Sequence, residues 1–135
     1  MGQFGIGQSV TRFDDPKLLK GEGKYLDDIN LPNQLRGYVL RSPYAHAKIK
    51  NISTNEAKTL EGIKLVLTGE DFVKSGLGCQ SPQIPRKRPN GEPFFVSPQP
   101  ALVSDTVKFV GDYVAFILAD NINQAKDAAE LLEVA

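Results

Sequence analysis

The run YVAFILA, residues 113–119, constrains the fold more than any other stretch of this sequence. From Val114 to Ala119 every side chain is apolar, so both faces of an extended chain would be apolar there. Such a strand is stable only where both of its faces are covered, as in the middle of a sheet. We therefore expect residues 114–119 to form a central, fully buried strand.

Alternation of apolar and polar residues predicts further strands, each with one dry and one wet face. In the run IKLVLT we expect Ile63, Leu65 and Leu67 on the dry face. The pair Gly111-Asp112 is typical of a two-residue type II′ hairpin turn, because glycine adopts the positive φ of the first turn position. The expected strands are 38–40, 47–50, 63–68, 105–110 and 113–119.

Capping signals predict where two short helices begin. Ser53 followed by Glu56 fits a capping box, in which each side chain satisfies a backbone N–H of the other residue. This box predicts a helix over about 54–61. Thr68 followed by Asp71 fits a second box, which opens another short helix.

A longer helix is expected within NINQAKDAAELLEV, where Asp120 or Asn121 would be the N-cap. The sequence stops at LLEVA, with neither a polar tail nor a helix stop signal. We therefore expect it to be a piece of a longer chain. The expected buried stripe of the helix is Ile122, Ala125, Ala129 and Leu132.

The chain divides by composition into an arm and a domain. Residues 1–34 are rich in glycine and aspartate and predict an irregular arm with at most a short helix near 16–19. Residues 35–135 predict a single α+β domain in the order β-β-α-β, long loop, β-β-α, with a mixed or antiparallel sheet. The loop, about 74–101, holds six of the nine prolines. Loops this long are functional, disordered or ordered by a partner.

Composition excludes several classes of function. Lysine plus arginine and aspartate plus glutamate each number 16, so no net field favours nucleic acid or an anionic membrane. No apolar run approaches the roughly 20 residues that span a bilayer. The single cysteine, Cys79, excludes an internal disulfide and a cysteine-held zinc or iron–sulfur site. We therefore expect a cytoplasmic protein that binds neither nucleic acid nor membrane.

The only histidine, His46, follows the expected turn at Pro43 and Tyr44. A catalytic histidine needs an acid or a nucleophile beside it, and the sequence offers no obvious one. One histidine and one distant cysteine are also too few for a metal site. We therefore expect His46 to brace the turn by a hydrogen bond to the backbone.

The remaining polar motifs give no catalytic constellation. Cys79 would be reactive if Arg86, Lys87 and Arg88 lowered its pKa, and it is otherwise an incidental loop cysteine. The basic run itself predicts a solvated loop or a docking loop for an acidic partner surface. We predict no catalytic, cofactor-binding or metal site. The Gly-x-Gly pairs at 5–7 and 21–23 lack the strand and helix of a dinucleotide site, and the carboxylate pairs at 14–15 and 27–28 point apart.

Four blocks of this sequence, in order, resemble one known domain. They are IGQSVTRFDDPKLLKGEGKYLDDINLPNQLRG, LRSPYAHAKIKNIS, AKTLEGIKLVLTGEDF and QPALVSDTVKFVGDYVAFILADNINQAKDAAELLEV. Together they resemble the N-terminal α/β hammerhead domain of the large, molybdopterin-binding subunit of the xanthine dehydrogenase, aldehyde oxidase and aerobic carbon monoxide dehydrogenase family. The stretch RSPYAHA is more similar to the bacterial and archaeal members, and only about 74–96 lies outside the resemblance.

The resemblance implies a parent oxidoreductase that oxidises aldehydes, purines or CO with water as the oxygen source. It implies molybdenum held by molybdopterin in the large subunit, FAD in a medium subunit and [2Fe-2S] clusters in a small subunit. The family's cofactor contacts and catalytic glutamate lie downstream of this domain, so no residue here inherits those roles. The expected partners are therefore the downstream cofactor domains and the two other subunits, and the chain alone is expected to be inactive.

Two other classes of function stay open from the residues themselves. The chain could be a freestanding interaction module that uses 74–101 as a docking loop. It could also be a small enzyme that uses Cys79.

Overall fold

The structure is a computed structural model that describes residue 7, residues 10–84 and residues 86–135. The chain divides into two compact units, Met1–Gln34 and Leu35–Ala135. In the first unit, helix α1 (Asp15–Leu19) has a proline in its first turn, and Gly21 follows it with a φ of 72°. A short 3-10 helix, η1 (Leu26–Asp28), comes next. The helix expected near 16–19 is thus confirmed, while the start of the arm lies outside the described residues.

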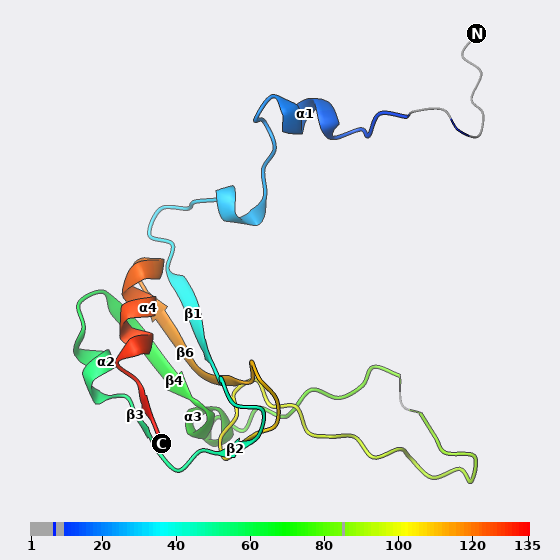
Figure 1. Ribbon diagram of the computed structural model, residues 1–135, viewed down its shortest axis with the longest axis vertical. Coiled ribbons are helices and arrows are strands. Elements are labelled where there is room, and N and C mark those ends of the chain that lie inside the picture. Colours follow the sequence, from blue (N-terminus) through cyan, green and yellow to red (C-terminus); the bar gives the residue numbers. More distant parts are fainter. Residues whose placement is uncertain (1–6, 8–9, 85) are drawn as a thin grey trace. The chain divides into compact units, whose positions relative to one another are not determined.

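The second unit is built on an antiparallel sheet in the order β1-β6-β4 (Figure 1). The pairing places Ile117 opposite Tyr38 on one side and Val66 on the other. The run YVAFILA is therefore the central strand, as predicted, and the α+β class is confirmed. The strands are β1 (Arg36–Arg41), β4 (Ile63–Thr68) and β6 (Tyr113–Ala119).

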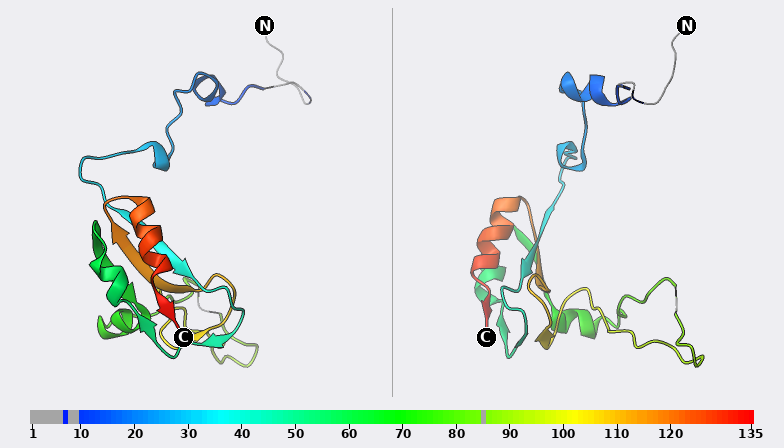
Figure 2. Two further views of the ribbon diagram at one scale, coloured as in Figure 1. Left: turned by 60° about the vertical axis from the view of Figure 1, so that its left-hand side comes forward. Right: turned by 45° about the vertical axis from the view of Figure 1, so that its right-hand side comes forward.

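Helices α2 (Asn55–Thr59) and α4 (Ile122–Glu130) cover one face of this sheet (Figure 2). Asn121 is the N-cap of α4, and its side-chain oxygen accepts a hydrogen bond from the backbone N–H of Gln124 at 3.0 Å. Alanines on α4 let its backbone approach the sheet closely. The core between these layers consists of Ala57, Val66, Ala115, Ile117, Ala119, Ala125, Ala128, Ala129 and Leu132.

The other face of the central strand is less covered than predicted. Phe116 and Leu118 are half-buried, whereas Ala115, Ile117 and Ala119 are fully buried. Helices α2 and α4 pack on the face that holds Ala115, Ile117 and Ala119, so full burial of both faces was a wrong expectation for Phe116 and Leu118.

Two expected apolar faces differ from the observed ones. The register of β4 shifts between Ile63 and Leu65, so Val66 faces the core while Leu65 is 41% exposed. On α4, Ile122 is 38% exposed and Ala128 is buried instead. Ile122 is the first residue of its helix and lies just past the end of the sheet at Ala119.

The predicted hairpin at Gly111-Asp112 is wrong. The strand β5 (Thr106–Val107) pairs with β2 (Ala47–Lys48), while β6 pairs with β1 and β4. Between them a carboxylate oxygen of Asp112 accepts hydrogen bonds from the backbone N–H groups of Lys108 at 2.6 Å and Phe109 at 3.4 Å. This side chain holds a longer loop, in which Gly111 does have the expected positive φ.

One capping box is confirmed and the other is wrong. Thr68 and Asp71 form the predicted box at the start of α3 (Gly69–Lys74). Ser53 instead belongs to β3 (Ile52–Ser53), which pairs with β7 (Glu133–Val134). Because β3 pairs with β7, Ser53 lies in a strand just before α2 begins. The same pairing places residues 133–134 in a strand, so α4 ends at Glu130.

Candidate interaction surface

His46 is exposed and does not brace the turn that precedes it. Among the described residues, its side chain has no hydrogen bond or ion pair. Ser42, which is 6% exposed, holds the turn instead. Its hydroxyl accepts a hydrogen bond from the backbone N–H of Tyr44 at 3.1 Å and donates one to the carbonyl of Tyr44 at 3.2 Å.

The other sequence candidates are not brought together. Cys79 is an exposed free thiol in the long loop. In the described part of the chain, no group of three or more histidine, cysteine, aspartate or glutamate side chains could hold a metal ion. The described residues also include no helix that is both long and apolar enough to cross a bilayer. The first Gly-x-Gly pair falls partly outside the described residues.

A polar hollow of about 210 Å³ lies beside the start of α3. It is lined by Lys50, Lys58, Glu70 and Asp71, so cations and carboxylates are mixed. The hydrogen bond from the backbone of Thr68 lowers the pKa of Asp71, and the hydroxyl of Thr68 lowers it further. This carboxylate is engaged as a helix cap.

The long loop, predicted without periodicity, is an irregular hairpin with two arms. At its base the backbone N–H of Gln80 donates to the carbonyl of Gln99 at 2.9 Å. At its tip the N–H of Arg88 donates to the carbonyl of Glu92 at 2.7 Å, and the two side chains lie 4.0 Å apart as an ion pair. An isolated bridge joins Lys87 to Pro93. The arms are thus joined at both ends.

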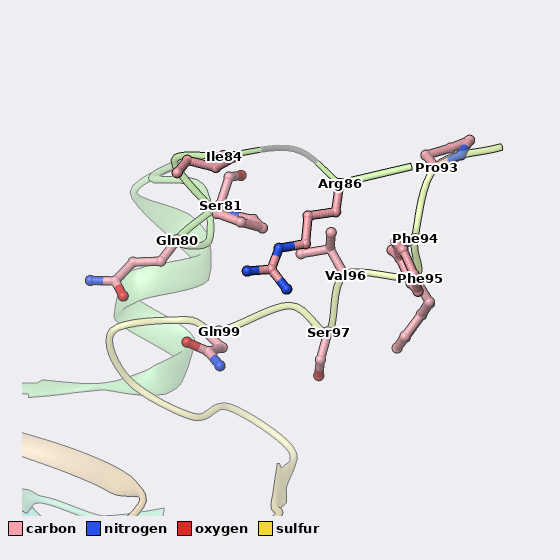
Figure 3. A pocket seen from close by; sticks show the side chains of 11 residues that line it. Gln80, Ser81, Ile84, Arg86, Pro93, Phe94, Phe95, Val96, Ser97 and Gln99 are labelled. Atoms are coloured by element: carbon pink, nitrogen blue, oxygen red, sulfur yellow. The ribbon is translucent and has the colours of Figure 1, made fainter. Parts of the chain in front are cut away.

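Between these two joins the arms enclose a hollow of about 750 Å³ (Figure 3). Its apolar side chains are unusually open to solvent, with Ile84 77% and Phe95 81% exposed. The Arg86 side chain extends from one arm into the space between the arms (Figure 3). The lining residues are Gln80, Ser81, Pro82, Ile84, Arg86, Pro93, Phe94, Phe95, Val96, Ser97 and Gln99.

The apolar part of this hollow was missed in the sequence, where only the basic run was singled out. The available signal was the run FFV at 94–96, three large apolar residues within a proline-rich loop. Exposed apolar side chains gathered in one place mark an interaction surface or a ligand-binding groove.

Residues 20–135 match the family model described as the aldehyde oxidase and xanthine dehydrogenase a/b hammerhead domain. The chain belongs to this family. The hammerhead domain is 36% identical over 127 residues to the nicotine 6-hydroxylase large subunit of Paenarthrobacter nicotinovorans, covering 94% of this chain and 15% of that protein. It is also 36% identical over 131 residues to the carbon monoxide dehydrogenase large chain of Afipia carboxidovorans, covering 96% and 15%.

Solved structures agree with this assignment. The hammerhead domain matches quinoline 2-oxidoreductase from Pseudomonas putida 86 with a TM-score of 0.81 and 36% identity, covering 96% of this chain and 16% of that chain. It matches CO dehydrogenase from Oligotropha carboxidovorans with a TM-score of 0.75 and 36% identity, covering 97% and 15%. The chain therefore spans about 15% of the length of such relatives.

Proposed function

We propose that this chain is the non-catalytic, N-terminal structural domain of a molybdenum hydroxylase large subunit. The parent enzyme would be an oxidoreductase that oxidises aldehydes, purines or CO with water as the oxygen source. The observation that carries the proposal is the hammerhead match over 20–135, together with the small share of each relative that the chain covers. A share of about 15% is the size expected of one scaffold domain within a larger enzyme subunit.

In this proposal the cofactors are bound outside this chain. One relative is the large molybdopterin subunit of nicotinate dehydrogenase from Eubacterium barkeri. We infer that no step of the reaction runs through this chain, in line with the finding that the described residues include no group of histidine, cysteine, aspartate or glutamate side chains that could hold a metal ion. Molybdopterin, which supplies the oxidative hydroxylation, would be held by downstream domains. FAD and [2Fe-2S] clusters would belong to a medium and a small subunit, in a cytoplasmic complex without nucleic acid or membrane.

The proposal is tested on the complete complex and on this chain in parallel. Each is assayed with aldehydes, purines and CO, and with a dye as electron acceptor. The complex is expected to oxidise at least one of these classes, and the 135-residue chain is expected to oxidise none. Turnover by the chain alone would falsify the scaffold role.

The exposed hollow in the long loop favours one alternative, a freestanding interaction module that uses 74–101 for docking. The coding sequence distinguishes the two functions. A reading frame that continues for several hundred residues past Ala135 supports the large subunit. A stop codon directly after Ala135 supports the freestanding module.

A further inference from the structure

The hollow between the loop arms combines one cation with apolar and uncharged polar side chains. Arg86 is the one charged side chain among its lining residues. Within the described residues its guanidinium has no hydrogen bond or ion pair, whereas Arg88 at the tip is paired with Glu92. A guanidinium offers a fork of donors that matches a carboxylate.

The walls around this guanidinium include large, exposed apolar side chains next to uncharged polar ones. Ile84 lies on the same arm as Arg86, and Phe95 and Val96 lie on the opposite arm (Figure 3). An exposed site of this kind leaves apolar surface in contact with solvent, which costs free energy until a partner covers it. A matching partner would place a carboxylate at the centre and large apolar side chains on either side.

We propose that the hollow receives a segment of the same large-subunit polypeptide, from beyond residue 135, that carries an aspartate or glutamate flanked by large apolar side chains. This inference rests on the proposed function. The chain spans about 15% of its relatives, so most of such a subunit lies outside it and remains tethered to it. Tethering gives that segment a high effective concentration at the loop, which a separate subunit lacks.

Charge reversal in the full-length subunit tests the carboxylate. Arg86→Glu is compared with Lys87→Glu, which is the same charge reversal at the adjacent residue. Lys87 is a suitable control because it does not line the hollow. Hydrogen exchange is followed by mass spectrometry over residues 80–99 within the assembled complex. Arg86→Glu is expected to speed exchange there roughly tenfold, since it removes charge-assisted hydrogen bonds and adds repulsion. Lys87→Glu is expected to match the wild type.

Exchange over β6 reports whether each variant is still folded, and it is expected to be unchanged in both. If both variants, or neither, change exchange over 80–99, the role of Arg86 is contradicted.

A photo-crosslinker identifies the occupant. A benzoylphenylalanine in place of Phe95 is expected to crosslink to a large-subunit segment beyond residue 135 that contains an acidic residue. The same group in place of Phe109, which is 58% exposed and outside the hollow, is the control and is expected to mark a different segment. A crosslink from position 95 to another subunit or to a second copy, or no crosslink, overturns the proposal. A complex that is active but lacks the crosslink refutes the docking site alone, whereas an inactive complex refutes the proposed function.

Discussion

The carboxylate of Asp71 accepts two hydrogen bonds from Thr68, one from the backbone N–H and one from the hydroxyl, each 2.9 Å long. Both bonds require the folded helix start, because only there does the Asp71 carboxylate lie beside Thr68. They favour the ionised form, so the pKa of Asp71 lies below its ordinary value of 3.8. The pair therefore links the stability of the domain to pH.

We predict that Asp71→Asn lowers the free energy of unfolding at pH 7 by about 1 kcal/mol, because it replaces the charged acceptor of the capping box at the start of α3 by a neutral one. The folded-state pKa is lower than the unfolded one, so the stabilisation is present above about pH 4 and is lost as the pH falls through the folded-state pKa. Urea unfolding at pH 7 and at pH 3 measures this. Asp127→Asn, an exposed change on α4, is the control, and an equal effect at both pH values would contradict the prediction.

Gly69 is required by a close approach of two backbones. A Cβ at this position would overlap the carbonyl oxygen of Val103 and the Cα of Ser104. Backbone atoms cannot move aside as a flexible side chain can, so Gly69→Ala is expected to destabilise the domain by about 1–3 kcal/mol. Gly78→Ala is the matched control, because nothing lies within 4 Å of its Cβ position. Thermal unfolding of both variants decides, and equal melting temperatures would be the contrary result.

Ile117 is fully buried at the centre of the sheet. Ile117→Ala is expected to lower the free energy of unfolding by about 2–5 kcal/mol, because it removes apolar contacts and leaves a cavity. Leu65→Ala, where the side chain is 41% exposed, is expected to cost much less. Denaturant titration of both variants compares them, and a larger loss for Leu65→Ala would show that the register of β4 differs from the one described.

The turn after β1 depends on serine rather than histidine. Ser42→Ala removes the hydroxyl that accepts a part-buried hydrogen bond from the backbone N–H of Tyr44 and is expected to cost about 0.5–1.5 kcal/mol. His46→Ala changes an exposed side chain and is expected to lie within about 0.5 kcal/mol of the wild type. Chemical denaturation of the two variants tests this ranking, and the opposite ranking would restore His46 as the brace.

Local signals predicted the elements that depend on local chemistry. The box of Thr68 and Asp71, the cap at Asn121 and the apolar run of β6 each depend on a few neighbouring residues, so the sequence was sufficient to locate them. The burial of Phe116 and Leu118 was overestimated, because it depends on what packs on their face of the sheet. The hairpin at Gly111-Asp112 failed because β5 and β6 pair with β2 and β1, which are distant in sequence. The box at Ser53 failed for the same reason, since β7 recruits this residue into a ladder.

The candidate surface was only partly predictable. The loop over 74–101 and its basic run are visible in the sequence, because they lack periodicity and carry prolines. The hollow depends on the joins between Gln80 and Gln99 and between Lys87 and Pro93, which no local pattern encodes. His46 was assigned to the turn from its position alone, whereas the hydroxyl of Ser42 lies closer to the backbone that it holds.

Molybdenum content tests the central claim, that this chain is scaffold and the chemistry lies elsewhere in the large subunit. The metal is quantified by mass spectrometry in the purified complete complex and in the purified 135-residue chain, both produced in a host that makes molybdopterin. We predict stoichiometric molybdenum in the complex and none above background in the chain. Stoichiometric molybdenum in the chain alone would contradict the claim, and so would a complete complex without molybdenum.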